Sequence, residues 1–143
     1  MAGSSVLNIT ELPKLTNLTY LNLSSTKITM NLTVLKQMTR LSELNLADIP
    51  PSRILPEILA SLTNLVSLNI AGNSQLVSNA VGILTQIGNL EYLNIEGATS
   101  VDGDVIPYLD RFLRLKHLRR NGTKLPSSVE VRYFVKNGLM RNK

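Results

Sequence analysis

Apolar residues recur along this chain in blocks where a leucine is followed by apolar residues three and five positions later. Four blocks keep the pattern and place an asparagine before the last apolar residue: 18–23, 41–46, 65–70 and 90–95. A fifth block, 115–120, ends in Arg120. The central leucines stand at 21, 44, 68, 93 and 118, so the steps are 23, 24, 25 and 25 residues. This period predicts a stack of similar units.

Each repeat is expected to form one coil with a short strand and a helical return. Apolar and polar residues alternate in the second half of each block, as they do on a strand with one buried face. Before the strand, apolar residues are three apart, as in Leu35, Met38 and Leu41, which suits a helix or 3₁₀ turn. Stacked coils would form a parallel sheet with strands ~4.8 Å apart and the helices on the outer side.

Several short motifs predict where the helical returns begin. Ser52 is a candidate N-cap for a helix over residues 53–61, which Pro56 confines or kinks. Ser78 and Asn79 are predicted to begin the next helical return, and Asp102-Gly103-Asp104 the last one. These positions place one return between each pair of later strands.

The two ends differ from the repeats. We expect residues 1–11 to form a lead-in or partial repeat, 12–125 to hold five repeats, and 126–143 to form a basic capping helix and tail. The capping-box spacing at 127–130 predicts the start of that helix, which could instead be the first element of a following domain. Arg120 marks the edge of the array, because an unpaired charge is costly to bury at a core position. No capping helix precedes residue 12, so we expect neighbouring repeats, a further domain or another molecule to cover the N-terminal end.

These blocks resemble the leucine-rich repeat superfamily, and the resemblance covers roughly residues 12–125. One position after each strand is variable, and in two repeats a glycine directly precedes it. This pattern looks more like that of intracellular cysteine-containing repeats, although this chain has no cysteine. The variable residues are Thr26, Ile49, Asn73, Ala98 and Thr123, and the glycines are Gly72 and Gly97. The resemblance implies an α/β solenoid with a curved parallel sheet on its concave side. It also implies a role like that of the substrate receptors of cullin-type ubiquitin ligases. The sequence shows no F-box motif, so that role rests on analogy.

Polar residues between the core leucines would line the concave face in columns. Tyrosine, charged and amide groups on a rigid sheet make a credible surface for recognising a protein. The predicted partner-binding residues are Tyr20, Asn22, Glu43, Asn45, Asn69, Glu91, Tyr92, Asn94, Glu96, His117 and Arg119.

Some of these residues have a structural interpretation as well. The asparagine column of Asn22, Asn45, Asn69 and Asn94 could stabilise the sheet through hydrogen bonds between stacked amides, or it could bind a ligand. For Tyr20 and Tyr92 the functional interpretation is favoured, because large exposed aromatic rings are costly unless they serve a function.

Composition argues against chemistry that depends on cysteine or on several histidines. The chain has no cysteine and one histidine, so disulfides and thiolate–metal sites are excluded. His117 is expected to be an exposed strand residue, and no nucleophile-elbow motif is present. We therefore predict no catalytic residues, no metal and no cofactor. Neither a signal peptide nor a membrane-spanning run is apparent, which predicts a cytoplasmic or nuclear protein without membrane contact.

Charge divides the chain unequally. Residues 1–110 hold 5 Lys or Arg and 9 Asp or Glu, net −4, whereas 111–143 hold 10 and 1, net +9. The basic segment suggests a second function, binding of nucleic acid or an acidic surface. No aromatic residues interleave the arginines in a stacking motif, so a solvated or docked solenoid end is the favoured interpretation. The leading hypothesis is a non-enzymatic domain that binds a protein partner on its concave face.

Overall fold

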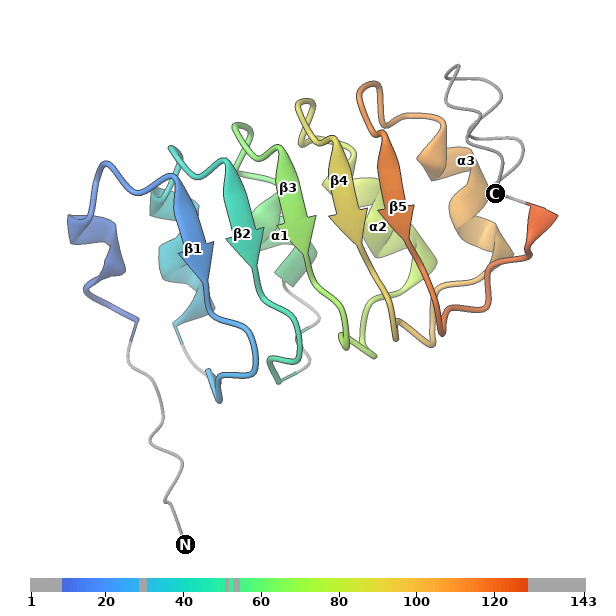
Figure 1. Cartoon of the computed structure of the whole chain (residues 1–143), viewed down its shortest axis with the longest axis horizontal. Helices are drawn as coiled ribbons and strands as arrows, with labels where there is room; N and C mark the ends of the chain where they lie inside the picture. The colour runs from blue at the N-terminus through green and yellow to red at the C-terminus, as the bar shows by residue number, and fades with distance from the viewer. Residues whose placement is uncertain (1–8, 29–30, 51, 53–54, 129–143) are drawn as a thin grey trace, which may run out of the picture.

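The computed structural model describes residues 9–28, 31–50, 52 and 55–128. Its strands pair in chain order into one parallel five-stranded sheet (Figure 1): β1 Tyr20–Asn22, β2 Glu43–Asn45, β3 Ser67–Asn69, β4 Tyr92–Asn94 and β5 His117–Arg119. The central leucines are directly opposite one another, so Leu21 pairs with Leu44 and Leu68 pairs with Leu93. The spacing of the repeats therefore predicted the register correctly, and the fold is the expected α/β leucine-rich repeat solenoid.

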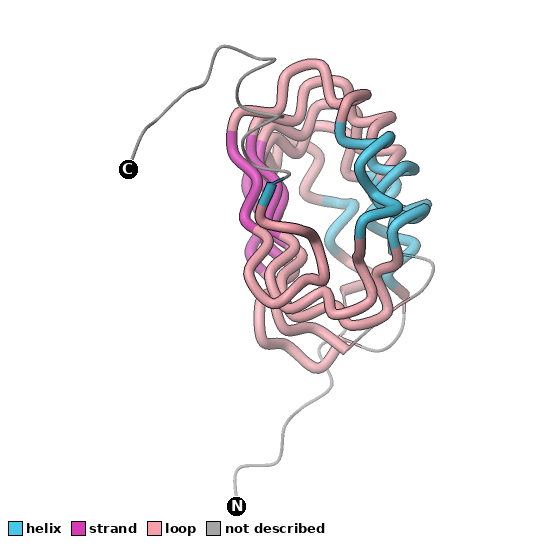
Figure 2. The backbone as a smooth tube through the Cα atoms, turned by 90° about the vertical axis from the view of Figure 1, so that its right-hand side faces the viewer, coloured by secondary structure: helices cyan, strands magenta, loops and turns pink. Residues whose placement is uncertain are grey.

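The helical returns cover the other side of each coil. Figure 2 looks along the stack and shows the strands on one side and the helices on the opposite side. The returns are short, and the first two are 3₁₀ helices: η1 Leu12–Lys14, η2 Leu32–Gln37, α1 Leu55–Leu59, α2 Ser78–Leu84, η3 Gly103–Val105 and α3 Ile106–Leu109. The predicted arrangement, with strands on one side and helices on the outer side, is confirmed.

The expected helix over 53–61 is shorter than predicted. Within the described residues it comprises Leu55–Leu59, and residues 53–54 lie outside them. Proline in its first turn has no N–H to donate, which suits only the start of a helix. At the other end the Ser61 hydroxyl donates to the Ile58 carbonyl at 2.7 Å, where the chain turns towards the next strand. The Leu55 N–H donates to the main-chain carbonyl of Ser52 at 3.4 Å.

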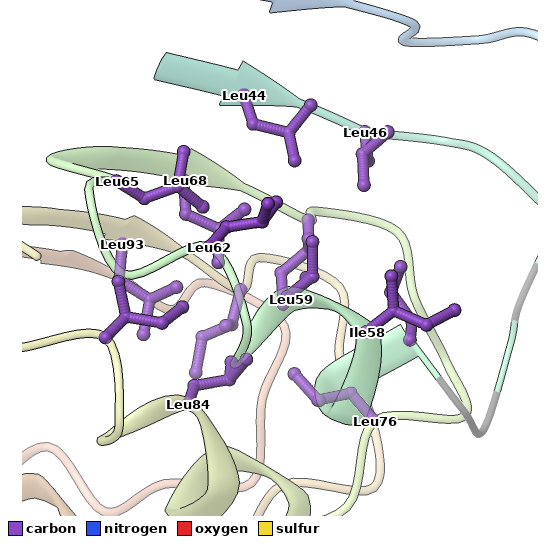
Figure 3. Packing of buried hydrophobic residues seen from close by; sticks show 14 of the residues in the cluster. Leu44, Leu46, Ile58, Leu59, Leu62, Leu65, Leu68, Leu76, Leu84 and Leu93 are labelled. Atoms are coloured by element: carbon purple, nitrogen blue, oxygen red, sulfur yellow. The ribbon is translucent and has the colours of Figure 1, made fainter. Parts of the chain in front are cut away.

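The core consists of apolar layers, one from each coil, packed against each other. In Figure 3, Leu62, Leu65 and Leu68 of one coil lie between Leu44 of the coil before and Leu93 of the coil after. Leu68 and Leu93 are fully buried. Burying one such side chain stabilises the fold by roughly 1.5–3 kcal/mol, and most of that comes from neighbouring coils.

A turn with a left-handed residue follows each strand. The residues with positive φ recur at equivalent positions: Ser25, Asp48, Gly72, Gly97 and Gly122. Glycine adopts this conformation without strain. At Gly72 it also permits close stacking, because an added Cβ would lie 2.5 Å from the Asp48 Oδ1 atom. These turns keep successive strands in step.

The two ends of the described array differ in how they are covered. Leu15 is 55% exposed, whereas its equivalent in the next coil, Met38, is 5% exposed, so the first coil has uncovered apolar surface. At the other end Arg120 is half-buried and donates to the Leu125 carbonyl at 3.2 Å. Arg120 directly follows β5, which is the last strand of the sheet within the described residues. The lead-in or partial repeat at 1–11 and the capping helix and tail at 126–143 fall largely outside the described residues.

Candidate interaction surface

The strands present a polar face away from the core, here called the open sheet face. It has two columns of strand residues in register: Tyr20, Glu43, Ser67, Tyr92 and His117, and Asn22, Asn45, Asn69, Asn94 and Arg119. Parallel strands ~4.8 Å apart hold neighbours in each column within reach of one another. The structure thus brings the predicted strand residues of the site to one side of the sheet, although Asn94 is buried there at 4% exposure. Glu91 and Glu96 flank the columns on either side of β4.

The asparagine column has a structural role, but by a different mechanism from the one predicted. Each side-chain oxygen accepts from the main-chain N–H two residues later in its own chain segment. The Oδ1 atoms of Asn45 and Asn94 accept from Ala47 and Glu96 at 3.0 and 2.9 Å. Those of Asn22 and Asn69 do the same for Ser24 and Ala71. The asparagines therefore stabilise the turn that ends each strand, rather than bonding through these oxygens to the next asparagine.

The C-terminal half of the face, at β4 and β5, contains a network of paired side chains. Arg119 lies 3.1 and 3.2 Å from the two carboxylate oxygens of Glu96. Hydrogen bonding by Tyr92, and then the charge of Glu96, raise the pKa of Arg119 above its usual value. The Tyr92 and His117 rings are tilted with centroids 6.5 Å apart. Arg119 is therefore paired with a carboxylate of the preceding repeat.

Two further contacts complete this network. The Asn121 amide donates to Glu96 at 2.8 Å. Lys116 Nζ lies 2.7 Å from Glu91 Oε2. Both carboxylates that flank β4 are therefore already engaged by the last coil. His117 is exposed, as predicted.

The N-terminal half of the face, at β1 and β2, lacks such pairing. Tyr20 is 55% exposed, and Glu43, directly opposite it in register, is also exposed. Within the part of the chain that the structure describes, Glu43 makes no ion pair. Val66, beside β3, adds an aliphatic group that is 38% exposed. An aromatic ring, a carboxylate and an apolar side chain are thus open to solvent together.

A polar ladder that the sequence did not reveal runs along the loops before the strands. Arg40 donates to Asn17 Oδ1 at 2.8 Å, and Arg114 donates to Asn89 Oδ1 at 3.0 Å. Between them, the Asn64 and Asn89 amides donate to carbonyls of the preceding coil. These residues all precede the first leucine of a repeat, so their common spacing was the available signal. Their partners within the chain indicate that the ladder joins coils.

The basic C-terminal end is partly neutralised. Lys116 and Arg119 contact carboxylates, and Arg114 donates to an amide. The Arg111 guanidinium lies 5.3 Å from the centroid of the Tyr108 ring. With Arg120, which donates to the Leu125 carbonyl, five basic side chains are engaged within the chain, which weakens this end as a surface for phosphates.

The helix side has a separate pocket of about 500 Å³, lined by Glu57, Ser74, Gln75, Val77, Asn79, Ala80, Ile83 and Ser100. Over the described ranges there is no group of three or more metal-binding side chains. Nor does any helix in them have the length and apolarity to cross a bilayer. The open sheet face is therefore the surface with the larger set of aligned polar and aromatic groups.

Comparison with known proteins shows the fold. No family model matches the sequence, and no curated protein is matched. A leucine-rich repeat protein of Leptospira interrogans superposes with a TM-score of 0.61 at 19% identity, covering 95% of this chain and 33% of that one. The functional domain of InlJ from Listeria monocytogenes, which includes a cysteine ladder, gives 0.54 at 20% identity over 83% of this chain and 28% of that one.

A further solved structure, actin-binding site 2 of leiomodin-1, gives a TM-score of 0.58 at 13% identity, covering 92% of this chain and 83% of that one. This chain spans about a third of the length of the Leptospira and Listeria chains, at 33% and 28%. At such identities the likeness concerns the solenoid alone.

Proposed function

We propose that this chain is a non-enzymatic interaction domain that binds a protein partner on its open sheet face. The observation that carries the proposal is the register of the sheet, which aligns exposed Tyr20 and Glu43 on a rigid surface. Partner-binding surfaces are enriched in tyrosine, and fixed side chains lose little entropy on binding. The leucine-rich repeat fold supports the proposal, since solenoids commonly present an extended surface of this kind.

The proposed contact residues are those that line or flank the two columns. The strand asparagines also serve the turns, so we assign the affinity chiefly to aromatic and charged side chains: Tyr20, Glu43, Glu91, Tyr92, Glu96, His117 and Arg119. Asn22, Asn45 and Asn69 would contribute through their amide nitrogens, whereas the predicted contact residue Asn94 is buried and is not assigned a share of the affinity. Hot spots usually form a small part of an interface, so a few of these residues would dominate.

A test needs a captured partner and matched variants. Tagged chain would be used to capture proteins from native lysate, and the affinity of the purified partner would then be measured by calorimetry. The double variant Tyr20→Ala/Tyr92→Ala should weaken binding by about tenfold or more, since aromatic hot spots are each worth over ~1 kcal/mol. Gln86→Ala, an exposed change on the helix side, is the control. Unchanged affinity in the double variant, with its fold intact by circular dichroism, would reject the proposal.

A finer proposal is that the domain recognises substrates for a cullin-type ubiquitin ligase in the cytoplasm or nucleus. It is supported by the resemblance of the repeats around Gly72 and Gly97 to intracellular ones. A capture experiment that recovers a cullin or its adaptor would support it. Recovery of other partners without either would count against it while leaving the interaction role intact.

Binding of nucleic acid through the basic end is the less favoured function. Its support is the net charge of +9 in residues 111–143. The engagement of Lys116 and Arg119 by carboxylates weakens it. Affinity for a duplex that falls steeply with salt would favour this function, because counterion release gives such a slope.

The N-terminal end is the place where we propose a further contact. Leu15 and its neighbours leave apolar surface uncovered on the first described coil. Another repeat, a domain or a partner placed there would bury it.

A further inference from the structure

The C-terminal half of the open sheet face shows how this surface holds a cation. Arg119 is bound by the carboxylate of Glu96, and hydrogen bonding by Tyr92 raises its pKa. The arginine belongs to the fifth repeat, whereas the tyrosine and the carboxylate belong to the fourth. On this part of the sheet, a carboxylate of one repeat therefore pairs with a guanidinium of the next repeat, which β5 holds in register.

The N-terminal half also has a tyrosine and a glutamate, but in a different arrangement, because Glu43 is in the same column as Tyr92 whereas Glu96 follows β4. Tyr20 and Glu43 are direct partners in register, on strands ~4.8 Å apart. In the second repeat, Asn45 stands at the position that Arg119 has in the last repeat. Ser42, just before β2, stands at the position of Lys116. Neither side chain carries a charge. Among the described residues, none forms an ion pair with Glu43.

We propose that Tyr20 and Glu43 form a docking site for an arginine side chain in a basic segment of a partner protein. The argument is one of charge complementarity. The guanidinium plane can lie on the tyrosine ring while its N–H groups donate to the carboxylate. Val66 is exposed nearby on β3's flank and would contact the aliphatic part of the segment. This inference rests on the proposed function and specifies the chemistry of the partner.

The test uses a displayed library of random linear peptides selected on the whole chain. Enriched peptides should carry an arginine, and replacing it by alanine should reduce binding. Glu43→Gln should weaken these peptides by about five- to tenfold and Tyr20→Ala by about two- to fivefold. Tyr20→Phe should retain most of the affinity, because the ring face remains. Glu57→Gln, which removes an exposed carboxylate from α1, is the matched control and should change nothing.

The outcomes separate this inference from the proposed function. Peptides that lose binding in Tyr92→Ala but not in Tyr20→Ala or Glu43→Gln would overturn the arginine site and leave the sheet-face function standing. Enrichment of acidic or purely apolar peptides at Tyr20 would do the same. If no enriched peptide depends on any residue of the open face, both fail. Sedimentation that shows self-association, abolished by Glu43→Gln, would identify a second copy as the occupant and overturn the partner assigned here.

Discussion

The two halves of the open sheet face carry similar residues in different states. At β4 and β5 the tyrosine and the glutamates contact basic side chains of the next coil. At β1 and β2, Tyr20 and Glu43 are exposed, and in the described residues no such cation meets them. The same chemistry therefore stabilises the array at one end and remains accessible at the other. Residue type alone does not identify a binding residue in a repeat protein, because the neighbouring repeat can use the same group.

The difference originates in the fifth repeat. Arg119 replaces the asparagine of the earlier copies, and Lys116 stands where they have Thr19, Ser42, Val66 and Glu91. Each of the two cations contacts a carboxylate of the fourth repeat. Arg120 occupies a core position and reaches the Leu125 carbonyl. A repeat that departs from the pattern thus finishes the described array and neutralises the surface beside it. The first two repeats contain no equivalent charges.

The largest effects are expected in the core beneath each half. Leu93→Ala in β4 should lower the free energy of unfolding by about 2–5 kcal/mol, because it leaves a cavity between two coils. Leu21→Ala in β1 should cost less, since Leu21 retains 8% exposure and its strand has a described neighbour on one side only. Urea titration followed by circular dichroism measures both. Equal losses would mean that the two halves are packed equally well.

A medium effect is expected from the asparagine column. Asn94 is 4% exposed, and its replacement by alanine leaves the Glu96 N–H without its acceptor, at a cost of about 1–3 kcal/mol. Asn22→Ala removes the same bond at an exposed site, where water can replace the oxygen, so the cost should stay below about 1 kcal/mol. The same urea titration compares the two variants. A larger loss at Asn22 would contradict the assignment of burial as the cause.

The sequence predicted the fold well and the site only in part. Leucine spacing fixed the register, because a coil of 23–25 residues can stack in only one way if Leu44, Leu68 and Leu93 are all to be buried. Alternation along each strand also placed the candidate residues on one face. It could not assign partners to Glu43 and Glu96, because pairing depends on which side chain the next coil supplies and on its rotamer.

The asparagines show the same limit in a different way. Their recurrence indicated a common role, but a side-chain oxygen beside a turn can accept from its own chain or from the next strand. The choice depends on the backbone of the turn, where Asp48 and Gly72 have positive φ. That local geometry was not readable from the spacing of the asparagines.

A smaller effect should distinguish the two glutamates in the absence of any partner. Glu96→Gln weakens the contacts with Arg119 and Asn121, so the melting temperature should fall slightly at low salt. Added salt should narrow the gap from the wild type, because it screens exposed charges. Glu43→Gln should leave the melting temperature unchanged. Calorimetric scans at low and high salt measure both, and an equal loss in both variants would remove the contrast between the halves.

The smallest effect extends the comparison to the starts of two helical returns, α2 and η3. The Ser78 hydroxyl donates to Asp102 Oδ1 at 2.8 Å. This bond, and then the Asp104 N–H, lower the pKa of the Asp102 carboxyl below its ordinary value of 3.8. The stabilisation is therefore present above the pKa of the unfolded chain and is lost as the pH falls through the folded value.

Ser78→Ala should accordingly lower the melting temperature slightly at neutral pH, and the deficit should shrink as the pH falls below about 4. Some deficit should persist, because the Ser78 hydroxyl also accepts from the Asp102 N–H at 3.0 Å, and that bond does not titrate. Asp102→Asn is the control, since it removes the titrating group and should flatten this part of the pH profile. A deficit of the same size at acidic and neutral pH would show that the Asp102 charge contributes nothing to joining these coils.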